Sequence, residues 1–273
     1  LNGYKLQVIH VPKTIDNDLV GTDHSPGFGS TARFISLATM GAGKDAQTMG
    51  ESAPITIIEV MGRDAGWLAA SSFLGKNKSQ EPPHIVCVPE HITDYGNFVN
   101  QLENARREFG YAIAVVAENS RDTNGIIGSH EEVLHEDQFG HKYFEGAGYY
   151  LSKFAESQLK VRIRYEKPGT IQRSMVSCIS SIDSFEAQMV GIKAVQYAVK
   201  GATEVMVAIK RDEIASKYTS STHLTPVEDV ADKVKYLPET YFDKNRLLPT
   251  QDFKTYALPL IGNQLPKFAD LLG

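Results

Sequence analysis

The segment Lys5-Leu6-Gln7-Val8-Ile9-His10-Val11-Pro12-Lys13-Thr14-Ile15-Asp16-Asn17-Asp18 joins a short apolar run to a polar, acidic turn. A brief run of Val, Ile and Leu that stops at a proline predicts a buried strand of a parallel sheet. In open α/β sheets, ligands bind beyond the carboxyl ends of the strands, which is where the polar residues fall. The sequence therefore predicts an α/β fold with a ligand site at this turn.

Three polar side chains of this turn have the chemistry needed for phosphoryl transfer. If residues 14–18 stay extended, Thr14, Asp16 and Asp18 share one face, with about 6.6 Å between alternate residues. Transfer to an alcohol requires a hydroxyl donor between a general base and a carboxylate that binds magnesium. An acidic turn that merely closes the strand explains the same residues, and composition does not separate the two interpretations.

Composition is that of an ordinary globular protein. The 273 residues, 42% apolar and 22% charged, allow one large domain or two modest ones. A net charge of −5 gives no reason to expect nucleic acid or an anionic membrane as a partner, so local cations must hold any anionic substrate. Cys87 and Cys178 lie in apolar runs and are expected to be buried free thiols.

Neither a membrane span nor a secretory signal is found in the sequence, so we expect a cytoplasmic protein. The chain has no initiating Met and opens directly on a strand, which suggests a piece of a longer protein.

Strands alternate with helices, which predicts a mostly parallel sheet with flanking helices. The expected strands are 55–60, 84–88, 111–117, 160–165 and 204–209. The expected helices are 64–74 with Asp64 as N-cap and Gly75 as C-cap, 94–109, 149–158, 183–200 and 227–235. Residues 135–143 predict a hairpin with its turn at 138–140. Beyond Arg211 the chain is irregular, and we expect it to wrap the surface without carrying chemistry.

Further candidates follow the predicted strands. Met61-Gly62-Arg63 joins a strand to a helix start, which suits a phosphate, although a turn with a solvent-facing Arg is equally compatible. Arg162 and Arg164 share one face of a predicted strand, and Arg173 follows a glycine turn. The three arginines are a candidate phosphate clamp. The competing interpretation is that they are ordinary surface arginines on an edge strand. Glu118 ends a strand, where it can accept a sugar hydroxyl or simply be solvated.

Two other patterns are rejected. Gly41-Ala42-Gly43-Lys44 lacks the spacing of a nucleotide-binding loop and does not follow a strand. The eight histidines show no paired metal-ligand spacing, and none lies beside a Ser or Cys nucleophile candidate.

Four segments together resemble motifs of the phosphofructokinase family, in order and in approximate spacing. They are Pro12–Asp18, Glu59–Arg63, Ala117-Glu118 and Gly169–Arg173. The resemblance covers about 1–209, with 39–53 and 126–160 as variable insertions. It implies a two-lobed α/β fold, here missing the N-terminal strands of the donor lobe. Residues 1–20 would end the donor-binding lobe and carry the catalytic loop, 21–175 would form the fructose 6-phosphate lobe, and 176–273 would return to the donor lobe and add a C-terminal extension.

The resemblance also implies an activity, which is phosphoryl transfer to the 1-hydroxyl of fructose 6-phosphate with Mg²⁺. Asp16 would be the general base, Thr14 would contact the transferred phosphoryl group, and Asp18 would lie near the metal. On the substrate side, the resemblance implies a loop of Met61, Gly62 and Arg63, in which Arg63 counters charge in the transition state. Glu118 would hold the sugar, and Arg173 would bind the 6-phosphate. Arg164 would reach into the site of a neighbouring subunit. Arg164 therefore implies a homo-oligomer, a dimer or a tetramer.

The implied phosphoryl donor is pyrophosphate, because family members that use it carry a lysine at the position of Lys13; ATP remains the alternative. Two departures are Thr170, where many members have His, and the stretch 52–54, where an arginine is expected. The family's donor-phosphate loop lies upstream of Leu1, so we expect little or no turnover from this chain alone. A non-catalytic sugar-phosphate-binding regulatory subunit and an unrelated α/β kinase are the competing hypotheses.

Overall fold

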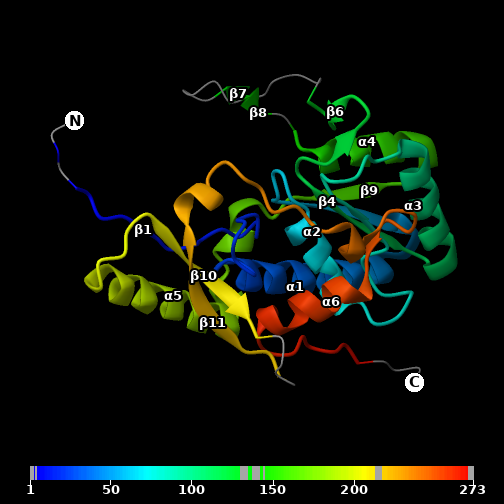
Figure 1. Cartoon of the computed structure of the whole chain (residues 1–273). Coiled ribbons are helices and arrows are strands. Elements are labelled where there is room, and N and C mark those ends of the chain that lie inside the picture. Colours follow the sequence, from blue (N-terminus) through cyan, green and yellow to red (C-terminus); the bar gives the residue numbers. More distant parts are fainter. Residues whose placement is uncertain are drawn as a thin grey trace.

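The computed structural model describes residues 3, 5–129, 135–136, 142–143, 145–212 and 217–269, and Figure 1 shows their arrangement. The strands are β1 Ile9–His10, β2 Ile55–Val60, β3 Ile85–Cys87, β4 Ala112–Ala117, β5 Arg121–Asp122, β6 Gly125–Ile126, β7 His135–Glu136, β8 Lys142–Tyr143, β9 Ile163–Glu166, β10 Val205–Arg211, β11 Ser220–Pro226, β12 Phe242–Asp243 and β13 Leu248–Pro249. The α-helices are α1 Phe28–Met49, α2 Trp67–Ser71, α3 Tyr95–Phe109, α4 Ala147–Leu159, α5 Ser181–Val199 and α6 Gln251–Ala257.

The main sheet has the order β3-β4-β2-β9, and all its strands are parallel. Its strands are apolar on both faces because helices cover both sides. Ile55 and Ile57 belong to the core with α3 and α4, whereas Ile58 and Val60 belong to the core with α1, α2 and α6. The α/β fold with a mostly parallel sheet and flanking helices is therefore confirmed, and Figure 1 shows the helices on both sides.

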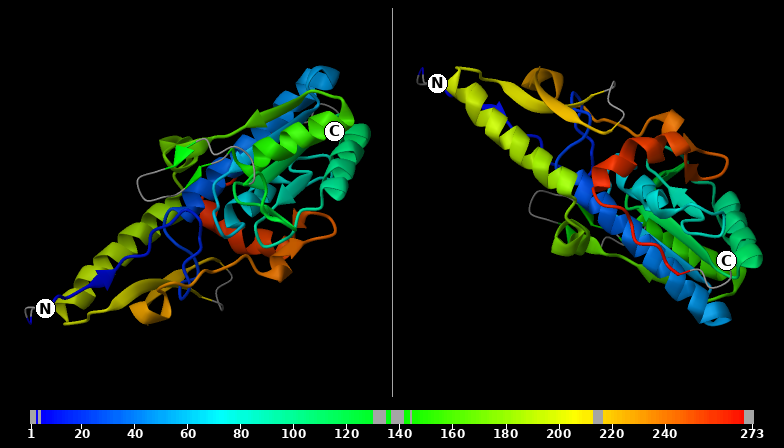
Figure 2. Two further views of the ribbon diagram at one scale, coloured as in Figure 1. Left: turned by 90° about the horizontal axis from the view of Figure 1, so that it is seen from above. Right: turned by 90° about the horizontal axis from the view of Figure 1, so that it is seen from below.

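The second sheet has the order β1-β10-β11, with β1 parallel and β11 antiparallel to β10. Both views in Figure 2 show it at one end of the molecule beside α5. The predicted parallel direction of the first strand is confirmed, but its predicted length and burial are wrong. Only Ile9–His10 pairs as a strand, and Leu6 is 69% exposed, because in the described residues β1 has a partner on one side only.

Several predicted helices are confirmed with small shifts. Asp94 caps α3 by accepting a hydrogen bond of 2.6 Å from Asn97 N, and Gly110 ends the helix at a φ of 82°. α4 and α5 begin two residues before the predicted positions. The predicted hairpin is present as the antiparallel pair β7 and β8, while its turn at 138–140 lies outside the described residues.

The helix predicted at 64–74 begins later, because Gly66 rather than Asp64 is its N-cap. The Gly66 N–H donates to both carboxylate oxygens of Glu90, at 2.9 and 3.1 Å, so a residue distant in sequence satisfies the helix start. α2 then continues as a 3₁₀ turn that ends at the predicted Gly75.

The largest error concerns residues 211–273. The predicted helix at 227–235 is only the 3₁₀ turn Val227–Asp229, and neither β11 nor α6 was expected. The segment does not merely wrap the surface, since Phe253 and Ala257 are fully buried in the main core.

Helix α1 was not predicted because its glycines interrupt the helical pattern. Two of them allow close packing: a Cβ at Gly43 would lie 2.5 Å from Pro82 Cγ, and one at Gly29 would lie 2.4 Å from Leu260 O. Cys87 and Cys178 are buried and unpaired. No helix in the described part of the chain has the length and apolarity needed to cross a membrane.

Candidate active site

The turn that contains Asp16 follows β1 and leads toward α1. Thr14 forms a bridge with Gly27, and its Oγ1 accepts a hydrogen bond of 3.1 Å from Asp16 N. The chain is not extended through residue 18, because Asn17 adopts a left-handed φ of 56°. The simple one-face spacing of Thr14, Asp16 and Asp18 is therefore wrong, and the turn at Asn17 sets the directions of the two carboxylates.

Asp16 is an acid poised near neutral pH. Burial raises the pKa of its carboxyl group to about 6, with Asp18 and Glu118 adding to the rise and Arg63 and Lys13 opposing it. These five side chains are therefore close enough to interact electrostatically. Asp16 Oδ1 is buried and has no hydrogen-bond partner. Such a carboxylate is ionised at pH 7 yet readily accepts a proton, as a general base must.

The Met61-Gly62-Arg63 loop lies at the carboxyl end of β2, beside the end of β4. Gly62 has a φ of 135°, a conformation that favours glycine, and the Glu118 carboxylate accepts a hydrogen bond from its backbone N–H. Met61 N donates to Gln172 Oε1 at 3.2 Å, which joins the loop to the turn before Arg173. The Arg63 side chain is exposed and lies close enough to Asp16 to lower the pKa of its carboxyl group.

Glu118 belongs to a row of interacting charged side chains that also includes Glu59 and Lys167. Burial raises the pKa of Glu118, and the neighbouring Glu59 adds to that rise. Glu59 is itself buried within β2 and forms an ion pair of 2.9 Å with Lys167. Sequence analysis overlooked Glu59, although a carboxylate inside the run Ile55–Val60 is the signal that marks a buried, partnered charge.

Of the three arginines of the predicted phosphate clamp, Arg164 and Arg173 lie apart, and Arg162 is exposed just before β9. Arg173 is exposed and ends the 3₁₀ turn Gly169–Arg173, which Gln172 joins to the Met61 loop. Arg164 is in register with Thr56, five residues before Met61, and forms an ion pair with Asp45 of α1. The structure thus brings together one cluster of predicted site residues, which are Lys13, Thr14, Asp16, Asp18, Arg63 and Glu118. The turn that carries Arg173 lies beside this cluster, whereas Arg164 lies outside it.

The carboxylates of this site fit magnesium better than a metal held by protein ligands alone. In the parts of the chain that are described, no three His, Cys, Asp or Glu side chains gather as a metal-binding group. Asp18 and the unpartnered Oδ1 of Asp16 supply two neighbouring carboxylates. Magnesium commonly takes one or two carboxylates from a protein and its other oxygens from phosphate and water, so the pair is sufficient.

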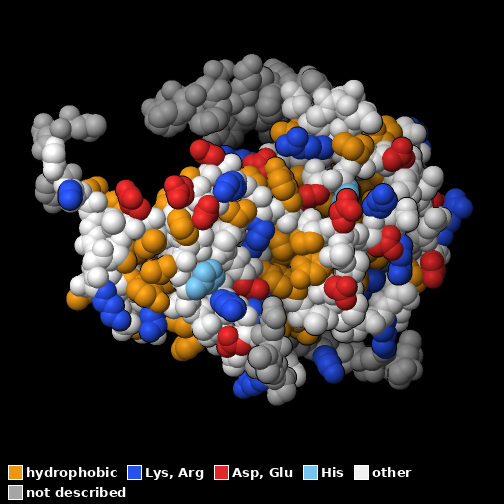
Figure 3. Space-filling model, viewed as in Figure 1, with side chains coloured by type: hydrophobic (Ala, Val, Ile, Leu, Met, Phe, Trp, Pro, Cys, Tyr) orange, Lys and Arg blue, Asp and Glu red, His pale blue; other side chains and the backbone are white. Residues whose placement is uncertain are grey.

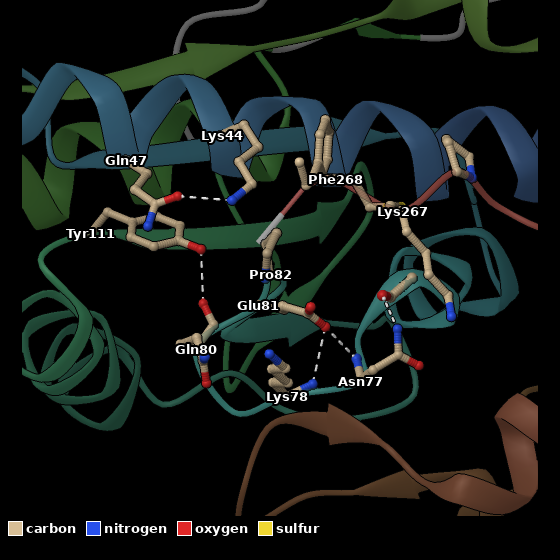
Figure 4. Close-up of a pocket in the computed structure, with 14 residues that line it drawn as sticks. Lys44, Gln47, Asn77, Lys78, Gln80, Glu81, Pro82, Tyr111, Lys267 and Phe268 are labelled. Atoms are coloured by element: carbon tan, nitrogen blue, oxygen red, sulfur yellow. Dashed lines mark hydrogen bonds between the residues drawn. The ribbon is translucent and has the colours of Figure 1, made fainter. Parts of the chain in front are cut away.

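A pocket of about 650 Å³ lies elsewhere, between α1 and the chain near Pro82 (Figure 4). Its lining includes Lys44, Glu81, Tyr111 and Phe268, and none of the predicted site residues. The pocket therefore does not belong to the cluster around Asp16.

The fold and the cluster together define an α/β protein with a general base and cations at the carboxyl edge of its parallel sheet. The chain belongs to the phosphofructokinase family, because the family model described as Phosphofructokinase matches residues 1–198.

Relatives named pyrophosphate–fructose 6-phosphate 1-phosphotransferase match nearly the whole chain. That of Rhodospirillum rubrum is 39% identical over 270 residues, which cover 96% of this chain and 65% of that protein. That of Halomonas elongata is 35% identical over 270 residues, which cover 97% of this chain and 63% of that protein. The crystal structure of a pyrophosphate-dependent phosphofructokinase from Nitrosospira multiformis matches with a TM-score of 0.84 and 31% identity, covering 99% of this chain and 64% of that one. The chain thus spans just under two thirds of the length of these relatives.

Proposed function

We propose that this chain is part of a pyrophosphate-dependent 6-phosphofructokinase, which converts fructose 6-phosphate to fructose 1,6-bisphosphate. The observation that carries the proposal is the buried, unpartnered Oδ1 of Asp16, whose carboxyl has a pKa of about 6 and lies within electrostatic reach of Arg63. The names of the relatives from Rhodospirillum rubrum and Halomonas elongata support both the donor and the acceptor.

In the proposed reaction, Asp16 takes the proton of the 1-hydroxyl while the hydroxyl oxygen attacks a phosphorus atom of pyrophosphate. The bond to the other phosphate breaks, and orthophosphate leaves with the bonding electron pair. Thr14 contacts the transferred group, and Arg63 stabilises the charge that develops on it. Magnesium, held through Asp18 and phosphate oxygens, would neutralise charge on the donor.

The substrate side is proposed from the remaining residues. Glu118 accepts hydrogen bonds from the sugar hydroxyls, Met61 and Gly62 bring the backbone close to the sugar, and Arg173 binds the 6-phosphate. Arg164 lies outside the cluster, which supports a role in the site of a neighbouring subunit and hence a homo-oligomer, a dimer or a tetramer.

We further propose that residues 1–20 end a donor-binding lobe, that residues 21–175 form the fructose 6-phosphate lobe, and that residues 176–273 return to the donor lobe and add a C-terminal extension, whose Phe253 and Ala257 pack in the core of the main sheet. Two surfaces support this division. In the described residues β1 has one free edge, and α5 exposes Phe185, Ile192, Val195 and Val199 at helical spacing, with Val199 83% exposed. The occupant that we propose for these surfaces is the part of the relatives' length that this chain does not span.

The cellular setting proposed is the cytoplasm, where the buried, unpaired Cys87 and Cys178 stay reduced. On the face shown in Figure 3, basic and acidic side chains are interspersed, which supports a small-molecule substrate rather than a nucleic acid or membrane partner.

The decisive experiment measures fructose 1,6-bisphosphate formation by a protein restored to the full length of the relatives, with pyrophosphate or with ATP. We expect turnover with pyrophosphate and at least about tenfold less with ATP, because the Lys13 ammonium neutralises a compact inorganic leaving group. Faster turnover with ATP would favour an ATP-dependent phosphofructokinase. Binding of fructose 6-phosphate without turnover from either donor would favour a regulatory subunit. We expect the 273-residue chain alone to show little or no turnover.

A further inference from the structure

The backbone of residues 235–237 contacts the turn that carries Asp16, although it lies outside the residues 1–198 that match the family. Lys235 N donates to Asp18 O at 2.7 Å, and Trp67 Nε1 donates to Lys235 O at 2.8 Å. Lys235 is thus fixed at both of its backbone polar groups, on one side by the Asp16 turn and on the other by the helix that follows Arg63.

The Lys235 ammonium adds a second attachment to the same turn. Its Nζ donates to Asn17 Oδ1 at 3.1 Å, to Thr22 O at 3.3 Å and to Asp23 O at 2.8 Å. A charged lysine has three N–H donors, so three acceptors use all of them. Nζ also lies 5.1 Å from the centre of the Trp67 ring, which favours a cation there.

Asn17 transmits these contacts to the two acidic residues beside it. Its left-handed backbone is uncommon for a residue other than glycine, and it persists because the side chain is held on both ends. Oδ1 accepts from Lys235 Nζ and from Ser25 N at 3.2 Å, while Nδ2 donates to Tyr256 OH at 3.1 Å. The orientation of Asn17 therefore sets the directions of the flanking carboxylates.

The same segment is tied to the loop that carries Arg63. Leu237 N donates to Glu90 Oε1 at 2.8 Å, and the same carboxylate accepts from Gly66 N at 2.9 Å. Glu90 thus joins the start of α2, three residues after Arg63, to residues 235–237.

We infer that residues 235–237 form a clamp that holds the Asp16 turn in register with the Arg63 loop. Lys235 and Glu90 are its positioning residues. The chemical consequence of the clamp rests on the proposed function, whereas its mechanical role does not.

Hydrogen exchange tests the mechanical role without any assay of activity. Lys235→Met keeps the length of the side chain but removes three donors, so backbone amides in 14–18 and 62–66 should exchange at least about tenfold faster. The matched control is Lys233→Met, which removes an exposed lysine two residues away and should leave both segments unchanged. Helix α3, which the clamp does not contact, should be unchanged in either variant. Unchanged exchange in both loops of folded Lys235→Met would overturn the proposal.

If Lys235→Met does not fold, Glu90 provides the second test. Glu90→Gln keeps an oxygen able to accept from both Gly66 and Leu237, whereas Glu90→Met removes it. We expect faster exchange at 62–66 in Glu90→Met and near-normal exchange in Glu90→Gln. Equal exchange in the two variants would overturn the clamp.

Kinetics of the full-length protein test the chemical consequence. Because misplacement of a reacting group by about 1 Å can cost about a hundredfold, Lys235→Met should lower kcat by tenfold to a hundredfold. KM for fructose 6-phosphate should rise by a smaller factor than kcat falls, since Lys235 contacts the Asp16 turn directly, whereas Glu118 and Arg173 are linked to the clamp only through the Met61–Gly62 loop. The double variant with Glu90→Met should lose less than the product of the single losses. An additive loss, or a rise in KM without a fall in kcat, would contradict the clamp, whereas an inactive wild type would contradict the proposed function only.

Discussion

Asp16 and Asp23 are two carboxylates seven residues apart on one stretch of chain, and their surroundings are opposite. The Asp16 carboxyl has a pKa of about 6, and its Oδ1 has no hydrogen-bond partner. Burial would also raise the pKa of Asp23, but hydrogen bonds from His24 and Arg211 outweigh burial and lower it to about 2. The fold therefore leaves one acid ready to accept a proton and binds the other firmly as an anion.

The surroundings of Asp23 form a neutral, fully partnered cluster. His24 places Nδ1 2.8 Å from Asp23 Oδ2 and Nε2 2.5 Å from Glu186 Oε2. Both ring nitrogens can donate only when the imidazole is protonated, so His24 is an imidazolium in this cluster. Its hydrogen bonds to Asp23 and Glu186 raise the pKa of His24, although burial alone would lower it. Tyr218 and Ser220 each donate to Glu186 Oε1 at 2.6 Å. Such a satisfied network stabilises structure, whereas an unsatisfied acid is typical of a reactive site.

The largest expected effect comes from removing the charge at Asp16. In the full-length protein, Asp16→Asn should lower turnover by about 10²–10⁴-fold, the usual contribution of a general base. The same change should raise the free energy of unfolding by roughly 1–2 kcal/mol, because it relieves burial of a charge and repulsion from Asp18 and Glu118. Steady-state kinetics and denaturant unfolding at pH 7 measure the two effects.

The sign of the stability change depends on pH in a defined way. The folded pKa of Asp16 lies above its ordinary value of 3.8, so the charge destabilises the fold increasingly from pH 3.8 to 6 and fully above pH 6. The gain in Asp16→Asn should therefore vanish near pH 3. Asp23→Asn is the matched control and should destabilise. If both variants change stability in the same direction, the contrast between the two acids is wrong.

Breaking the His24 cluster should cause the next largest effect. Glu186→Ala leaves a buried imidazolium with one carboxylate removed, which typically costs about 3–5 kcal/mol of unfolding free energy. Glu186→Gln keeps an acceptor for Tyr218 and Ser220 and should cost less. Denaturant unfolding measures both variants, with the exposed Glu228→Ala as a control. A cost below about 1 kcal/mol for Glu186→Ala would show that the cluster contributes little.

Local patterns predicted the strand–helix alternation and the polar turn after the first strand, because a parallel sheet requires continuous apolar runs and places its ligands at one edge. They did not predict the cap that Glu90 provides for α2, nor the contact of Lys235 with Asn17, since each joins residues far apart in sequence. Helix α1 was overlooked for a related reason, because Gly43 is explained only by its packing on Pro82.

A third prediction concerns acid unfolding. Asp23 has a folded pKa below its ordinary value, so its stabilisation, roughly 2 kcal/mol, is present above about pH 3.8 and is lost as pH falls toward 2. His24 has a raised folded pKa, so its contribution is present below about pH 6.5 and is lost as pH rises through the folded value. Wild type should thus exceed Asp23→Asn in stability most clearly near pH 5, and the two should converge near pH 2. A constant difference across this range would refute the assignment.

The smallest expected effect is the influence of Lys13, the exposed cation beside Asp16, on the pH profile of turnover. Lys13 is the weaker of the two cations that lower the pKa of Asp16, after Arg63. An exposed charge contributes about 0.2–1 kcal/mol, so Lys13→Met should shift the acidic limb of kcat/KM upward by a few tenths of a pH unit. The shift should shrink as salt is added, because the pair is screened. Lys5→Met removes another exposed lysine on the same stretch and should leave the profile in place. A larger shift in Lys5→Met than in Lys13→Met would mean that net charge, rather than proximity to Asp16, tunes the base.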